Sequence, residues 1–254
     1  MTFLVCAVAV VIVLAATWTA AVRIGRHSVI DVVWGLGFTV IALIAFVIGD
    51  GDLARRLLVL ALTAIWGVRL ALHIARRSVG AGEDPRYERI LGRHPDPDTA
   101  AITKVYLPQG VVMYFVSLPV QVAMGEQGGL GPLAWIGVAV WLAGFAFEAI
   151  GDWQLTRFRA DPDSKGKVLD TGLWRYTRHP NYFGDALVWW GLFLIAAEHW
   201  PGVLTFLSPV AMTYFLAGKT GKPLLEKQLT RTRPGYADYV ERTSGFVPLP
   251  PKKH

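Results

Sequence analysis

Residues 2–22 read TFLVCAVAVVIVLAATWTAAV, a stretch that contains no charged side chain. A helix needs about 20 mostly apolar residues to cross a bilayer, and this stretch meets that length. It has no basic segment ahead of it and is too long for the apolar core of a secretory signal. We therefore expect a retained transmembrane helix here, and several later stretches share its character.

The composition of the whole chain indicates the same class of protein. Its 254 residues are 53% hydrophobic and only 17% charged, and the mean hydropathy is +0.40. A large soluble α/β enzyme would show shorter apolar runs that are bounded by turns. We predict an all-α protein, an integral membrane bundle of seven transmembrane helices that forms a single membrane domain over residues 1–254. The expected spans are about 2–22, 29–49, 54–75, 106–124, 131–154, 185–199 and 202–217, followed by a tail over 219–254.

The distribution of basic residues predicts the orientation. With the amino terminus outside, nearly all of the 25 lysine and arginine residues fall in the inner links and the tail. Only Arg55 and Arg56 fall outside, and Arg69 lies within a span. The positive-inside rule then places the carboxyl terminus in the cytoplasm. Because this topology explains the net charge of +6, no nucleic-acid partner is needed to account for it. The excess of arginine over lysine favours a bacterial protein, and hence a multi-pass protein of the inner membrane.

Several classes of site are excluded by the sequence. The single cysteine, Cys6, rules out an internal disulfide, and no spacing of cysteine and histidine suits a structural metal. No G-x-G-x-x-G motif follows a strand pattern, which excludes a Rossmann fold. The sequence does not divide into two matching halves of inverted topology, so it does not suggest a transporter built from repeats. Nothing in the sequence indicates the oligomeric state.

Charged residues inside an apolar span are costly and are therefore candidates for function. Asp31 is the first of these, although it could also serve as a first-turn carboxylate of a helix that Ser28 caps. Arg69 either extends its charged end to the membrane surface or pairs with Asp31 across the bundle. We favour the pair, and His73, one turn further on, shares the face of Arg69.

Glu148 and Asp152 stand four residues apart on one face at the inner end of the fifth expected span. Like charges at this spacing repel, so a positive or hydrogen-bonding group should lie between them. That group is either a ligand or a network with the arginines that follow, Arg157 and Arg159. By contrast, the charge run over 83–89 is typical of a solvated turn.

Residues 175–190, RYTRHPNYFGDALVWW, place many polar side chains directly before an apolar run. The aromatic residues alone are consistent with an interfacial belt. A belt does not explain the histidine, the asparagine and the aspartate. Pro180 and Asn181 favour a helix start, and a helix amino terminus beside Arg175 and Arg178 is suited to a phosphate group.

The stretch TGLWRYTRHPNYFGD, residues 171–185, resembles the signature of the steroid 5α-reductase family, in the bacterial branch that carries a domain of unknown function of the DUF1295 type. Further motifs agree with this branch in their order: SVIDVVWGLGF, RLALHIARR, GEDPRYE, FEAIGDWQLTRFR, KPLLEK and RPGYADYVERTSGFVP. The resemblance implies seven transmembrane helices, with cytoplasmic loops that cap a cavity for NADPH. It also implies reduction of a carbon–carbon double bond conjugated to a carbonyl, in a lipid or sterol-like substrate.

The resemblance also assigns roles to individual residues. Trp34 and Trp189 are the candidate substrate contacts. The candidate cofactor-binding residues are Glu148, Asp152, Arg157, Arg159, Arg178, His179, Asn181, Tyr182, Asp185, Glu226, Tyr236 and Tyr239.

The expected acid pair departs from the family pattern. Steroid-reducing members carry a glutamate on the second span and a tyrosine on the third, and together these polarise the carbonyl of the substrate. Here the second span offers Asp31, and the third offers Arg69 and His73. Asp31 can donate a proton only if burial favours its protonated form, and otherwise Tyr87 or His73 takes this role. The candidate catalytic residues are Asp31, Arg69, His73 and Tyr87.

Two alternatives remain open. The stretch RHPNY also resembles membrane methyltransferases of the isoprenylcysteine and phospholipid type. Their cosubstrate, S-adenosylmethionine, carries a sulfonium, which favours carboxylates and aromatic faces over clustered arginines. The third possibility is a membrane protein without enzymatic activity.

Overall fold

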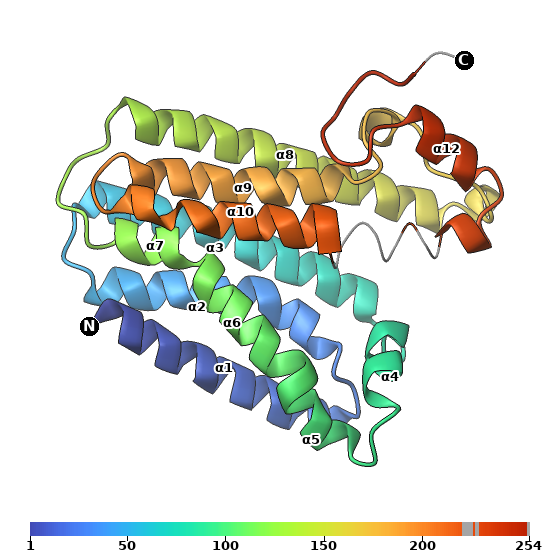
Figure 1. The fold of residues 1–254 in the computed structure, drawn as a ribbon, viewed down its shortest axis with the longest axis horizontal. Helices are drawn as coiled ribbons and strands as arrows, with labels where there is room; N and C mark the ends of the chain where they lie inside the picture. The colour runs from blue at the N-terminus through green and yellow to red at the C-terminus, as the bar shows by residue number, and fades with distance from the viewer. Residues whose placement is uncertain (220–225, 227–228, 253–254) are drawn as a thin grey trace. The chain divides into compact units, whose positions relative to one another are not determined.

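A computed structural model describes residues 1–219, 226 and 229–252 (Figure 1). These residues form helices and connecting segments without strands, as the all-α prediction requires. They group into two compact units. Unit 1 contains Met1–Gly131 and Ala196–Val203, and unit 2 contains Pro132–Ile195 and Leu204–His254.

Unit 1 is built on three long helices and a series of shorter ones. Helix α2 packs against both α1 and α3, and α6 lies across α1 and α2. The long helices are α1 (Thr2–Ile24), α2 (Val29–Ile48) and α3 (Leu53–Ser78). The shorter ones are α4 (Pro85–Leu91), α5 (Pro97–Ala101), a π-helical turn (Ile102–Tyr106), α6 (Leu107–Val116) and α7 (Leu118–Ala123).

Helices α2 and α3 approach each other closely where each carries a glycine. A Cβ atom on Gly35 would lie 2.3 Å from the carbonyl oxygen of Gly67, and a Cβ on Gly67 would meet the oxygen of Gly35 at the same distance. Small residues at such a crossing let two backbones pack directly, which is a common device in membrane helix pairs. The two glycines therefore fix the distance between α2 and α3.

Unit 2 centres on α8 (Pro132–Ala160) and α9 (Pro180–Ala197), which also meet through glycines. A Cβ on Gly144 would lie 2.6 Å from the carbonyl oxygen of Gly184. Trp190 on α9 donates its indole N–H to the hydroxyl of Thr213 on α10 (Leu207–Tyr214), at 3.1 Å. The remaining helical pieces are the 3₁₀ turns Pro162–Ser164, Gly172–Arg175 and Gly202–Phe206, the π-helical turn Phe215–Lys219, and α12 (Tyr236–Arg242).

Four helices within the described residues are long and apolar enough to cross a membrane, namely α1, α2, α3 and α8. They indicate a membrane-embedded helical protein, as predicted. The full set of seven spans is not confirmed. The expected span 106–124 is divided at Ser117 into α6 and α7, because Pro119 has no N–H to donate to the preceding turn. The expected span 202–217 corresponds to a shorter apolar helical stretch, Gly202–Gly218.

Arg55 is fully buried and holds the loops of unit 1 together. Its guanidinium donates to the carbonyl oxygens of Gly128 and Gly129, at 3.0 and 2.7 Å. It also pairs with two carboxylates, at 2.9 Å from Glu198 and 3.3 Å from Glu126. Burial raises the pKa of Glu126 to about 7, and the neighbouring charge of Glu198 adds to this effect against the opposing effect of Arg55.

We expect Glu126 to make the stability of the protein depend on pH. Because its pKa in the folded protein lies above the ordinary 4.5, the folded protein holds a proton that the unfolded chain releases as the pH rises from about 4.5 to about 7. The wild-type Tm should therefore fall over this window, and Glu126→Gln should reduce the slope. Glu88→Gln, which removes an exposed carboxyl, is the control and should keep the wild-type slope. Parallel curves for wild type and Glu126→Gln would contradict the assignment.

Candidate functional site

The polar cluster of unit 1 forms where α2, α4 and α6 meet. Asp31 lies in the first turn of α2, and its Oδ1 accepts a hydrogen bond from the hydroxyl of Tyr87 on α4, at 2.6 Å. Its Oδ2 pairs with the guanidinium of Arg86, at 2.7 Å. The side-chain amide of Gln109 on α6 donates to the Tyr87 hydroxyl at 3.3 Å. Side chains from α2, α4 and α6 thus meet at the hydroxyl of Tyr87.

The start of α4 is positioned by the residues just before it. Asp84 caps the helix by accepting from the backbone N–H of Arg86 at 2.8 Å, and Pro85 occupies the first helical position. Glu83 binds the start of α2, where its carboxylate accepts from the backbone N–H of Ser28 at 2.9 Å and from that of His27. The charge run that we interpreted as a solvated turn is therefore an anchor that brings Tyr87 to Asp31.

The partners of Asp31 differ from the one expected. Arg86 and Tyr87 contact its carboxylate, whereas we expected Arg69 to do so. Ser28 does not use its side chain to cap α2. Burial raises the pKa of the Tyr87 hydroxyl, and the negative charge of Asp31 and the hydrogen bond to it raise this pKa further, so the phenol stays protonated.

A second hydrogen-bonded chain in unit 1 runs through His27, which is buried. Its Nδ1 lies 3.2 Å from the hydroxyl of Tyr106, and its Nε2 lies 3.0 Å from Oδ1 of Asp98. Tyr106 and Tyr87 belong to the same hydrophobic cluster, together with Leu91 of α4. The hydrogen bonds of His27 therefore connect the segment between α1 and α2 to the hydrophobic cluster that contains Tyr87.

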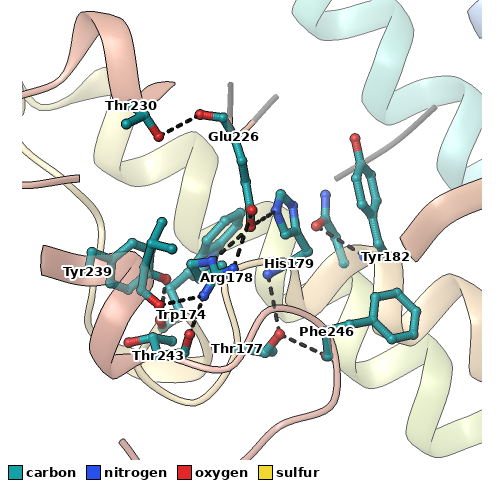
Figure 2. Close-up of polar contacts among 12 residues, drawn as sticks. Trp174, Thr177, Arg178, His179, Tyr182, Glu226, Thr230, Tyr239, Thr243 and Phe246 are labelled. Carbon is teal, nitrogen blue, oxygen red and sulfur yellow. Dashed lines mark hydrogen bonds and ion pairs between the residues drawn. The ribbon is translucent and has the colours of Figure 1, made fainter. Parts of the chain in front are cut away.

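The polar cluster of unit 2 is organised by Arg178 (Figure 2). Its Nε donates to Oε1 of Glu226 at 2.7 Å, and its Nη2 lies 3.3 Å from Oε2 of the same carboxylate. Its Nη1 donates to the carbonyl oxygens of Val240, at 2.9 Å, and of Thr243. His179 places Nε2 at 3.1 Å from Oε1 of Glu226. The guanidinium predicted to bind a phosphate thus already has a carboxylate partner within the chain.

The segment before α9 is fixed by the tail that follows α12. The backbone N–H of Arg178 donates to the carbonyl oxygen of Ser244 at 2.9 Å, and the hydroxyl of Thr177 donates to that of Phe246 at 2.8 Å. Tyr239 on α12 donates its hydroxyl to the carbonyl oxygen of Trp174. Figure 2 shows the hydroxyl of Thr177 next to the backbone of Phe246.

Electrostatics explain the charge state of this cluster. Burial raises the pKa of the Glu226 carboxyl, but the hydrogen bonds from His179 and Arg178 and the positive charge of Arg178 outweigh burial and lower this pKa to about 2. Burial also raises the pKa of Tyr236 to about 12, with a smaller contribution from the charge of Glu226. At neutral pH the cluster therefore holds an ionised glutamate beside protonated phenols.

Other predicted residues of unit 2 gather near the start of α9. The amide of Asn181 donates to Oδ1 of Asp152 on α8 at 3.1 Å, and its oxygen accepts from the backbone N–H of Tyr182. The rings of His179 and Tyr182 are stacked, with centroids 5.2 Å apart and planes at 6°. Arg157 lies outside this group, over the ring of Trp153.

The remaining predicted residues have simple placements. Trp34 packs edge-on against Phe38 on α2, with ring centroids 5.4 Å apart. Within unit 2, Glu148 on α8 and Asp185 and Trp189 on α9 are buried, Tyr236 and Tyr239 on α12 are buried, and Arg159 at the end of α8 is exposed. Within unit 1, Arg69 and His73 lie on α3 and are partly buried.

Sequence reasoning missed Gln109, His27 and the partners of Asp31. Gln109 could have been singled out as one of two amides, with Gln121, inside the expected span 106–124, since a polar side chain there needs a partner. His27 had no comparable signal, because it stands in a polar link beside basic residues. Its role depends on Asp98 and Tyr106, which are distant in sequence.

We expect Arg178→Gln to destabilise the protein strongly. Removal of one partner from a buried ion pair leaves the other charge uncompensated, which costs about 3–5 kcal/mol. The matched control is Arg242→Gln, because Arg242 pairs with Asp170 at 2.6 Å in a far more exposed position, where a pair contributes about 1 kcal/mol or less. Thermal unfolding in detergent should separate the two variants, and equal Tm losses would argue against a structural role for Arg178.

Comparison with known proteins identifies one family. A family model described as "Protein of unknown function (DUF1295)" matches residues 17–243. An uncharacterized protein of Schizosaccharomyces pombe is 26% identical, over 91% of this chain and 75% of the yeast protein. No solved structure shows a significant match.

Proposed function

We propose that this chain, which belongs to the DUF1295 family of proteins of unknown function, is a membrane-embedded NADPH-dependent reductase. The proposed reaction reduces a carbon–carbon double bond conjugated to a carbonyl in a lipid or sterol-like substrate. The sequence motifs shared with the steroid 5α-reductase family support this proposal, since they are distributed over most of the chain. A relationship to the bacterial branch of that family is part of the proposal.

The contact between Tyr87 and Asp31 is the observation that carries the proposal. The resemblance implies a glutamate on the second span and a tyrosine on the third, whereas here the second span has Asp31 and the third has no tyrosine. In the folded chain a tyrosine from α4 lies 2.6 Å from the carboxylate of α2 instead. A reduction at a conjugated carbonyl needs a proton donor of this kind, whereas methyl transfer does not.

In the proposed reaction the polar cluster of unit 1 stabilises the negative charge that develops on the substrate. When hydride adds to the β-carbon of an enone, negative charge develops on the carbonyl oxygen, and a hydrogen-bond donor stabilises it. In the proposal the Tyr87 hydroxyl turns its single O–H from Oδ1 of Asp31 to the carbonyl oxygen of the substrate, and Gln109 keeps donating to the phenol oxygen. Arg86 then remains the partner of the Asp31 carboxylate. Solvent water then supplies a proton to the α-carbon of the enolate, so that the double bond becomes a CH–CH unit. Bound NADPH supplies the hydride, with both electrons.

Some side chains of unit 2 are suited to binding a dinucleotide, and others are not. Arg178 is paired with Glu226, so in the proposal the phosphates bind the exposed guanidinium groups of Arg157 and Arg175. The remaining cofactor-binding candidates lie at the start of α9 and along α8. The stacked pair of His179 and Tyr182 supplies an aromatic surface suited to a flat ring.

The proposed setting is the inner membrane of a bacterium, with the amino terminus outside and the carboxyl terminus in the cytoplasm. The distribution of basic residues supports this orientation. It would place the polar links that carry the candidate residues on the side where NADPH is available. The partner molecules would be this cofactor, a lipophilic substrate and membrane lipid.

One observation favours a second candidate function. Arg178 is paired with Glu226, and unit 2 also contains the buried carboxyl side chains Asp152 and Glu148, an arrangement less suited to a phosphate than a cluster of arginines alone. A sulfonium cosubstrate is suited to carboxylates and aromatic rings, so a methyltransferase that uses S-adenosylmethionine is the alternative.

Ligand binding distinguishes the two reactions. We expect calorimetry on the detergent-solubilised protein to show NADPH binding with micromolar or tighter affinity, and no binding of S-adenosylmethionine. Asn181→Ala should weaken NADPH binding, because Asn181 links Asp152 of α8 to the start of α9. Gln127→Ala, which removes an exposed amide in unit 1, is the control. Binding of S-adenosylmethionine alone would replace the reductase with the methyltransferase.

A second test addresses the proton donor. Tyr87→Phe should lower kcat by about 10²- to 10⁴-fold, because the donor to the carbonyl is lost, and should leave the Kd for NADPH unchanged. The rate can be followed as NADPH oxidation with a steroid enone as probe. Tyr176→Phe removes an exposed hydroxyl and should behave as wild type. If Tyr87→Phe retained full kcat, the proton donor would lie elsewhere.

A further inference from the structure

A groove in unit 1 opens where α1, α2 and α3 come together at the ends predicted to face the cytoplasm. Its volume is about 380 Å³. Its walls are mainly apolar and include Ile24, Val29, Val32 and Ala75. Arg26 and Ser78 supply polar atoms, and none of the residues that line the groove is acidic.

The guanidinium of Arg26, which lines this groove, makes few hydrogen bonds to other groups of the protein. Its Nη1 and Nη2 reach a single acceptor, the carbonyl oxygen of Ser78, at 3.5 and 3.4 Å. Its Nε is buried and has no hydrogen-bond partner in the described structure. A guanidinium has five N–H donors, so most of its capacity remains for an acceptor from outside the chain.

The surroundings of the groove are suited to an acidic group. Arg23, Arg76 and Arg77 are exposed in the adjoining turns of α1 and α3. The nearby carboxylate of Glu83 is held by the backbone N–H groups of His27 and Ser28. Glu83 keeps its negative charge, and the carboxylate of Asp84 acts electrostatically on Arg77. These two carboxylates offset only part of the positive charge of Arg23, Arg26, Arg76 and Arg77.

We propose that this groove binds an anionic phospholipid, with its phosphate at Arg26 and the first part of an acyl chain along the apolar walls. The volume accommodates a phosphate and several methylene groups, and burial of each methylene adds to the affinity. The groove lies at the ends of three helices long and apolar enough to cross a membrane, which is where a lipid head group meets a membrane protein. A free phosphate would use Arg26 but not the apolar walls. The site does not depend on the proposed reductase activity.

The experiment measures the Tm of the full-length protein in detergent micelles during titration with lipid. Phosphatidylglycerol should raise the Tm in a saturable way, and the neutral phosphatidylcholine should not. Arg26→Gln should weaken the apparent affinity for phosphatidylglycerol about tenfold, as the loss of a charge-assisted hydrogen bond implies. Arg93→Gln removes an exposed cation that does not line the groove and should leave the affinity unchanged.

A second variant guards against a folding defect, because Arg26 also contacts the end of α3. Ala75→Leu keeps Arg26 and fills the apolar part of the groove, so it too should weaken the effect of phosphatidylglycerol. Equal stabilisation by both lipids would overturn the proposal, as would an unchanged affinity in Arg26→Gln. If inorganic phosphate alone produced the full shift, the site would bind a free anion rather than a lipid.

Discussion

Charge taken out of water must be compensated, and this requirement determines how the connecting segments of the chain are placed. Asp31 is compensated by α4, Arg55 by the loops at Glu126 and Glu198, and Arg178 by the tail. In each case the partner is distant in sequence. Apolar packing positions the long helices, but these contacts decide where the links between them lie. Some of the candidate site residues, among them Tyr87 and Arg178, stand on those links.

The bounds of the long helices could be predicted closely, because the thickness of the bilayer and the hydropathy of the sequence largely determine them. Expected spans 2–22 and 29–49 correspond to α1 and α2 within two residues. Helix α8 extends to Ala160, beyond the expected end at 154, because hydropathy falls there while the helical conformation continues through polar residues. The division near Pro119 could also have been anticipated, since a proline inside an apolar run removes a backbone donor.

Some residues of the candidate site could be singled out from the sequence, but their contacts could not. The stretch before α9 was singled out because its polar residues exceed what an interfacial belt requires. The pairing of Arg178 with Glu226 was not foreseen, because residues 48 apart have no spacing rule that relates them. For the same reason Asp31 was assigned to Arg69, the cation on the neighbouring span, although its partners come from the next link. Helical periodicity describes one element at a time, and these contacts join several.

The contacts of Arg178 have a consequence for biosynthesis. Its carboxylate partner is 48 residues later in the chain, and its carbonyl partners are 62 and 65 residues later. At a synthesis rate of about 5–20 residues per second, the ribosome adds Arg178 to the chain several seconds before those groups exist. During that interval its cation has to remain hydrated or rest among lipid head groups. The amino end of α9 therefore completes its fold only after translation has passed the last of these partners.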